Sequence, residues 1–178
     1  MTGAVWTLDQ IHEAVHRGPY TSALTPNAIT HFREEATLKA ACGQARLIQW
    51  KDIRNNPPKQ LKISPISAIP HKSKAFRSIL DLSFSLRLRG GTTLPSVNDS
   101  TEKTAPQGSI NQMGHTLSRI IHAFASTDPS AKILMAKFDI KDGFWQLDCQ
   151  EGKEYNFAYV LPQPDDTPED KWIIVIPT

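Results

Sequence analysis

The mostly apolar run that ends at Asp139 constrains the fold of this chain more than any other feature. Residues 132–138 (KILMAKF) have the length of a strand rather than of a helix, and such oily strands lie at the centre of a sheet. A carboxylate directly after a buried strand loses hydration, so it needs a hydrogen bond, an ion pair or a metal ion. The sequence therefore predicts a central strand with a capping or functional carboxylate at its end.

The first 44 residues indicate two helices. Thr7 and Gln10 have the spacing of a capping box for a helix that continues to about His16. Thr25 is a suitable N-cap for a second helix, in which apolar residues recur at helical spacing until Gly43. We expect these helices to form an N-terminal lead-in over residues 1–44.

Beyond residue 44 the apolar pattern becomes extended. Segments 62–69 (KISPISAI) and 76–82 (FRSILDL) predict a hairpin with a basic tip at 71–75 (HKSKA). Segments 155–161 (YNFAYVL) and 172–176 (WIIVI) predict a second pair of strands. The hairpin belongs to a predicted β-rich region.

A helix and an irregular segment separate these strand pairs. Residues 90–108 are rich in Gly, Thr, Ser and Pro, which is typical of an irregular crossing. A helix with one buried face is predicted where four apolar residues follow at helical spacing. These residues are Leu117, Ile120, Ile121 and Phe124.

Charge is distributed unevenly along the chain. Residues 39–91 contain eleven Lys or Arg and two acidic residues, whereas residues 92–178 contain seven basic and twelve acidic residues. A basic block can bind a polyanion through phosphate contacts, and acidic residues can bind a metal ion. A solvated basic surface without a ligand explains the same pattern, so both interpretations stay open here.

Composition excludes several classes of protein. Two cysteines, Cys42 and Cys149, lack the spacing of a metal site and are too few for a disulfide scaffold. No apolar run approaches the roughly 20 residues that span a bilayer, and the N-terminus lacks the pattern of a signal peptide. We expect no membrane partner and an intracellular protein, cytoplasmic or nuclear.

Several segments together resemble reverse transcriptases. Residues 136–148 (AKFDIKDGFWQLD) resemble the first catalytic motif of that family, an aspartate after an apolar strand followed by a short turn and an aromatic residue. Residues 62–83 resemble its fingers hairpin, with a basic tip and an R-x-hydrophobic-x-D strand. The resemblance extends over about residues 20–178 in the family's order, and it is closer to the retrotransposon-type branch than to the viral one.

This resemblance implies an RNA-directed DNA polymerase that uses two metal ions to transfer a deoxynucleotide to a primer 3′-hydroxyl. Asp139 would bind both ions, which would be Mg²⁺ or Mn²⁺, and the carbonyl of Ile140 would help. The implied partners are an RNA or DNA template with its primer, and a dNTP.

The resemblance also implies a nucleotide-binding set. Lys72 and Arg77 would clamp the incoming triphosphate, because both cations neutralise charge that develops during transfer. Asp142 and Gly143 would lie beside the triphosphate, mainly through backbone amides. Phe144 would exclude a 2′-hydroxyl and so select deoxynucleotides.

The sequence departs from the family in one respect. Reverse transcriptases supply further carboxylates as an aspartate pair on a later hairpin, and that hairpin is missing here. Asp165 and Asp166 stand between prolines and are expected to be solvated. We therefore expect a fragment that lacks the C-terminal palm and thumb, binds metal weakly and does not polymerise alone. A decayed fragment, a truncated gene model and a retained binding module remain open.

Two alternatives compete with a polymerase fragment. The basic block alone is compatible with a non-catalytic nucleic-acid-binding module derived from the fingers. The motif HEAVH fits the HExxH pattern of zinc peptidases, in which His12 and His16 would bind zinc, Glu13 would be the general base and Glu35 a third ligand. The helix is short and breaks near Gly18, which favours the other interpretations.

The expected fold is α+β. It combines the N-terminal helices (1–44), a β-rich fingers unit with the basic hairpin (45–131), the start of a right-hand-polymerase palm sheet (132–150) and a strand hairpin that returns to the fingers (151–178).

Overall fold

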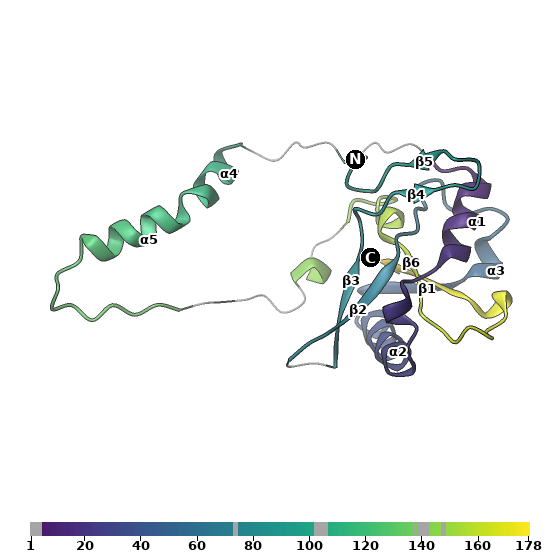
Figure 1. The fold of residues 1–178 in the computed structure, drawn as a ribbon, viewed down its shortest axis with the longest axis horizontal. Coiled ribbons are helices and arrows are strands. Elements are labelled where there is room, and N and C mark those ends of the chain that lie inside the picture. Colours follow the sequence, from purple (N-terminus) through teal and green to yellow (C-terminus); the bar gives the residue numbers. More distant parts are fainter. Residues whose placement is uncertain (1–4, 73–74, 102–106, 137, 139–142, 147–148) are drawn as a thin grey trace. The chain divides into compact units, whose positions relative to one another are not determined.

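The computed structural model describes residues 5–72, 75–101, 107–136, 138, 143–146 and 149–178. Helices and small antiparallel sheets give a mixed α+β fold, which confirms the expected class at this level (Figure 1). The chain divides into one unit of residues 1–101 with 143–178, and a second unit of residues 102–142. No helix among the described residues is both long and apolar enough to cross a membrane.

Both N-terminal helices begin at their predicted caps. In α1 (Leu8–Arg17) the backbone N–H of Thr7 donates to Gln10 Oε1 at 2.8 Å, and Thr7 Oγ1 accepts from the N–H of Gln10. In α2 (Pro26–Ala41) the Thr25 hydroxyl accepts from a first-turn N–H, and proline occupies the first turn, where its missing N–H costs nothing. A short 3₁₀ turn, η1 (Thr21–Ala23), joins the two helices.

A three-stranded antiparallel sheet lies at the centre of the first unit. It consists of β1 (Ala45–Gln49), β7 (Ile173–Pro177) and β6 (Tyr159–Val160), in the order β1-β7-β6. The pairing of β6 with β7 confirms the second predicted strand pair. The addition of β1 to the other edge of β7 was not predicted.

Alternate side chains of β7 enter two separate hydrophobic cores, as the pleat of a strand requires. Ile174 and Ile176 belong to the α1 cluster and Val175 to the α2 cluster. The α1 cluster comprises Trp6, Ile11, Ala14, Val15, Trp50, Leu61, Ile63, Leu86, Leu94, Ala158, Val160, Ile174 and Ile176. The α2 cluster comprises Ala23, Ala28, Phe32, Ala36, Ala45, Ile66, Ala68, Tyr159, Leu161 and Val175.

The predicted hairpin forms from β2 (Ile66–Pro70) and β3 (Phe76–Leu80), with Ile66 opposite Leu80 (Figure 1). Its first strand begins later than expected. Residues 62–65 are buried but contribute only an isolated bridge between Ile63 and Ala158.

Short elements complete the first unit. Part of the stretch that was expected to be irregular forms β5 (Thr93–Leu94), which pairs with β4 (Leu86–Arg87) across a turn that contains Gly91 at φ +84°. Only glycine adopts such a φ without strain. The remaining elements are α3 (Trp50–Ile53), η2 (Gly143–Gln146), η3 (Glu154–Phe157) and η4 (Glu169–Lys171).

The second unit contains α4 (Gln107–Gly114) and α5 (Thr116–Ala125). The predicted helix at 117–124 is therefore present, but the second unit does not itself bury the apolar face of this helix as predicted. Its four apolar side chains are between 40% and 69% exposed. The prediction of a central strand at 132–138 is also wrong for the described residues 132–136 and 138, which are exposed and belong to no strand. A strand needs a hydrogen-bonded neighbour, and sequence pattern alone does not supply one.

Candidate functional site

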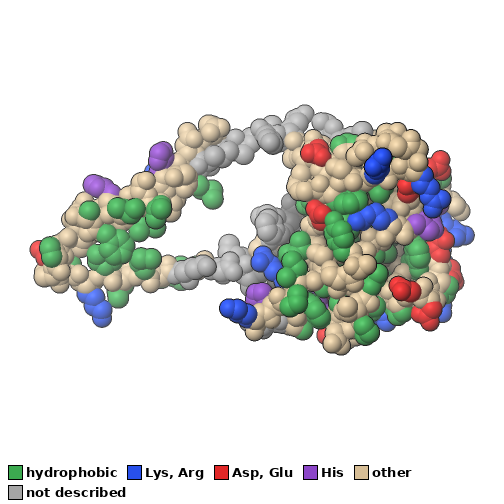
Figure 2. Space-filling view, viewed as in Figure 1, with side chains coloured by type: hydrophobic (Ala, Val, Ile, Leu, Met, Phe, Trp, Pro, Cys, Tyr) green, Lys and Arg blue, Asp and Glu red, His purple; other side chains and the backbone are tan. Residues whose placement is uncertain are grey.

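The β2–β3 hairpin carries the two cations predicted to bind a triphosphate. Arg77 in β3 and Lys72 beyond the end of β2 are both exposed, while the side chains that flank Arg77 turn partly inward. This alternation follows from the pleat of a half-buried strand. On the face shown in Figure 2, the cationic side chains of the first unit are interspersed with acidic ones rather than gathered in one patch.

The hairpin is held to neighbouring elements by specific contacts. The backbone N–H of Tyr20 donates to the carbonyl of Ile66 at 3.0 Å, and the N–H of Ala68 donates to Ser22 Oγ at 3.3 Å. From α2, Glu35 accepts a hydrogen bond from Ser78 Oγ. These contacts fix both strands of the hairpin, so its cations project from a supported element.

Directly after β3, Asp81 makes a polar contact with Tyr20, the residue that precedes η1. The Tyr20 hydroxyl donates to Asp81 Oδ2 at 2.7 Å, and Asp81 Oδ1 accepts from the N–H of Ser83 at 3.0 Å. Burial, followed by the hydrogen bond to Asp81, raises the pKa of Tyr20. Arg17 stacks 3.7 Å from the ring centroid of Phe84 beside this pair. Asp81, the last residue of the family-like R-x-hydrophobic-x-D strand, has a structural contact here.

The predicted first catalytic motif is only partly described. Asp139, Ile140 and Asp142 lie outside the described residues, as does Lys137, whereas Phe138 is described and exposed. Gly143 is half-buried and begins η2, which also includes Phe144.

The η2 turn shares a core with the hairpin. Trp145 packs against the α2 cluster, as Phe76 and Leu80 of β3 do. The ammonium of Lys39 in α2 lies 5.0 Å from the ring centroid of Trp145. The hairpin cations and the turn that follows Asp139 in sequence are thus carried by segments anchored to one cluster.

The side chains of the HEAVH motif contact neighbouring segments and so hold α1 in place. His12 Nε2 donates to the carbonyl of Arg54 at 2.8 Å, and the His12 ring meets the edge of Trp50. His16 Nδ1 donates to the His12 carbonyl at 2.8 Å, and Glu13 Oε1 accepts from the backbone N–H of Arg89 at 3.0 Å.

The third ligand proposed for zinc is elsewhere. Glu35 contacts the hairpin from α2, whereas His12 and His16 pack against the tryptophans of another region, Trp50 and Trp172. Within the described part of the chain, no three His, Cys, Asp or Glu residues gather as a metal site.

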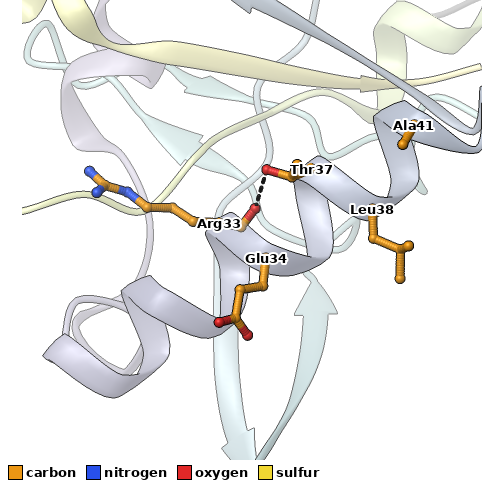
Figure 3. Close-up of a pocket in the computed structure, with 5 residues that line it drawn as sticks. All are labelled: Arg33, Glu34, Thr37, Leu38 and Ala41. Carbon is orange, nitrogen blue, oxygen red and sulfur yellow. Dashed lines mark hydrogen bonds between the residues drawn. The ribbon is translucent and has the colours of Figure 1, made fainter.

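Two surface hollows lie along the helices. One, of about 590 Å³, is lined by charged or titratable side chains of α1 and by Arg89. The other, of about 510 Å³, lies along the outer face of α2 and is lined by Arg33, Glu34, Thr37, Leu38 and Ala41 (Figure 3). The Thr37 hydroxyl donates to the Arg33 carbonyl at 2.8 Å, which is a bond within the helix. Neither hollow contains a residue of the predicted polymerase site, whereas His12, Glu13 and His16 of the HEAVH motif line the first.

Sequence reasoning did not predict the surroundings of three side chains, Lys62, Glu35 and Lys39. Lys62 is 1% exposed, and its amine has no hydrogen-bond partner among the residues that the structure describes. Burial, followed by the charge of Lys153, lowers the pKa of Lys62. On α2, Glu35 and Lys39 contact the hairpin and η2, and their spacing of four residues on one helix was the available signal.

Compared with known proteins, the chain matches no protein-family model, no curated protein sequence and no solved structure.

Proposed function

We propose that this chain is a fingers and early-palm segment of a retrotransposon-type reverse transcriptase, and that it binds primer–template and a deoxynucleotide. One observation carries the proposal. The hairpin with Lys72 and Arg77 and the turn that begins at Gly143, four residues after Asp139, pack against the same α2 cluster. This common anchor supports the proposal that the hairpin cations and the η2 turn contact one ligand.

The donor atoms of the proposed metal site fit Mg²⁺ or Mn²⁺. The carboxylate of Asp139 and the carbonyl of Ile140 are hard oxygen donors, and such ions accept further oxygens from water and phosphate. When bound, the ions would activate the primer hydroxyl and stabilise the leaving pyrophosphate.

The other proposed residues bind and select the nucleotide. The fork of Arg77 and the point charge of Lys72 hold phosphate oxygens, and the amides at Asp142 and Gly143 donate to the triphosphate. The ring of Phe144 excludes a 2′-hydroxyl, so the proposed substrate is a dNTP.

Binding without polymerisation is the second candidate for the chain by itself. Asp165 and Asp166 are exposed in a loop. They are the only two adjacent aspartates in the sequence. They resemble solvated residues rather than metal ligands. We therefore propose that nucleotidyl transfer needs an aspartate pair supplied by a palm and thumb polypeptide, whereas ligand binding resides in this chain.

Fluorescence anisotropy with a labelled DNA primer on an RNA template tests the proposal. We expect salt-sensitive binding of the duplex, and an increase in its affinity when Mg²⁺ and the matching dNTP are added. Arg77→Ala should weaken the nucleotide effect about 10- to 100-fold, since it removes charge-assisted hydrogen bonds. Asp139→Asn should abolish that effect. Lys51→Ala, at an exposed position of α3, is the matched control.

The outcomes separate the candidates. Duplex binding that is indifferent to Mg²⁺, dNTP and Asp139→Asn would leave only a nucleic-acid-binding module. A wild-type chain that binds neither duplex nor nucleotide would rule out both.

A further inference from the structure

One face of α2 contacts both segments of the proposed site. His31, Glu35 and Lys39 follow one another at intervals of four residues, which places them on one side of a helix. His31 and Lys39 lie about 12 Å apart along the axis, from eight residues at 1.5 Å each. His31 and Glu35, which contact the hairpin, therefore lie about 12 Å and about 6 Å along the axis from Lys39, which contacts η2.

His31 and Glu35 hold β3 in place. Glu35 accepts the hydrogen bond from Ser78 Oγ, and His31 Nε2 lies 3.7 Å from Glu35 Oε2. The His31 ring lies 5.7 Å from that of Phe76. Phe76 and Ser78 flank Arg77, so α2 holds both neighbours of the cation and leaves its guanidinium on the opposite face of the strand.

Lys39 holds η2. Its side chain is 5% exposed, and its ammonium lies over the ring of Trp145. Attraction between a cation and an aromatic ring increases when water is excluded. Trp145 follows Gly143 by two residues, so this contact anchors the turn predicted to lie beside a triphosphate.

The sheet supports the same face of α2. Tyr159 of β6 is buried in the α2 cluster, and its burial, followed by the nearby charge of Glu35, raises the pKa of the phenol. The phenol therefore stays neutral beside the carboxylate. Glu35 is thus set between β3 and the central sheet, which restricts its movement.

We propose that Glu35 and Lys39 are positioning residues, and that α2 sets the separation between Arg77 and the backbone amides of the η2 turn. This inference rests on the proposed function for its ligand, a Mg²⁺-bound dNTP. Neither side chain contacts the nucleotide in this arrangement. Their loss should therefore weaken nucleotide binding while the affinity for primer–template stays the same.

The test compares Glu35→Ala and Lys39→Met with Glu34→Ala, which alters an exposed residue of the same helix. Each test variant should weaken the Mg²⁺–dNTP effect on anisotropy about five- to tenfold and leave duplex affinity within about twofold. Glu35→Gln should restore binding, since its amide oxygen can accept from Ser78. Glu34→Ala should behave as wild type.

A second readout does not depend on the nucleotide. Hydrogen exchange should accelerate in β3 for Glu35→Ala and in residues 143–146 for Lys39→Met. In protein labelled with 5-fluorotryptophan, Lys39→Met should shift the ¹⁹F resonance that Trp145→Phe removes. Unchanged exchange and an unmoved resonance would overturn the positioning role. Unchanged dNTP affinity in a protein that Arg77→Ala impairs would also overturn it. Altered exchange in a protein that binds no dNTP would instead refute the proposed function.

Discussion

The buried amine of Lys62 gives a sharp prediction about stability. Its nitrogen is enclosed, and no described residue gives it a hydrogen bond, so the folded state carries a desolvation cost without compensation. Methionine has a similar length and no polar group to satisfy. Lys62→Met should therefore raise the free energy of unfolding by about 1–3 kcal/mol. In a chain of this size that corresponds to a rise in Tm of roughly 3–9 °C.

The pH dependence of this gain follows from the lowered pKa of Lys62. Below its folded-state pKa the amine is charged in both states, and the cost of burying the cation is fully present. As the pH rises from there towards the ordinary lysine pKa of 10.5, the folded protein holds fewer protons on this group than the unfolded chain, so wild-type stability increases. The advantage of Lys62→Met over the wild type should shrink across that window.

Urea denaturation of both proteins from pH 7 to pH 10.5 measures this difference. Lys59→Met removes an exposed lysine three residues away, and it should change stability by less than about 0.5 kcal/mol. The reasoning is refuted if Lys62→Met lowers stability at pH 7, or if Lys59→Met gives the same gain. A gain that does not shrink with pH would show that the buried cation is not its source.

Further predictions concern two other titratable side chains. Burial raises the pKa of Tyr159 above its ordinary value of 10.0 in the folded state. Above pH 10 this phenol therefore loses its proton in the unfolded chain before it does so in the folded protein, and wild-type stability should fall as the pH rises through 10. Tyr159→Phe should reduce this alkaline loss in urea titrations, and an unchanged slope would contradict the explanation. His12→Ala should cost about 1–2 kcal/mol, because it removes the hydrogen bond to Arg54 and the ring contact with Trp50. Purified wild-type protein should contain no stoichiometric zinc by elemental analysis, and zinc that His12→Ala removes would instead support the peptidase.

Local sequence signals predicted the elements that depend on local physics. The caps at Thr7 and Thr25 start helices because they satisfy backbone donors within the same turn. The apolar pattern of residues 76–82 predicted the strand β3, in which Arg77 is exposed. The pairing of β6 with β7 also followed from two apolar runs separated by a polar loop.

Features that depend on distant partners could not be predicted in the same way. The burial expected for Phe124 in α5 needs another surface to cover it, and a helical period does not show whether one is present. Likewise the run around Leu134 has the composition of a strand but no described neighbour. In the candidate site, Lys39 and Glu35 were missed as a pair because their importance lies in contacts with β3 and η2, which are distant in sequence.

The position of β7 between β1 and β6 has a consequence for biogenesis. Ala45 pairs with Pro177, so α1, α2 and β1 leave the ribosome long before the strand that completes both of their cores. Closing so large a loop is entropically costly and makes such topologies slow to fold. Nascent chains should therefore expose the apolar sides of both helices throughout most of translation. We expect them to bind chaperones until β7 has been synthesised.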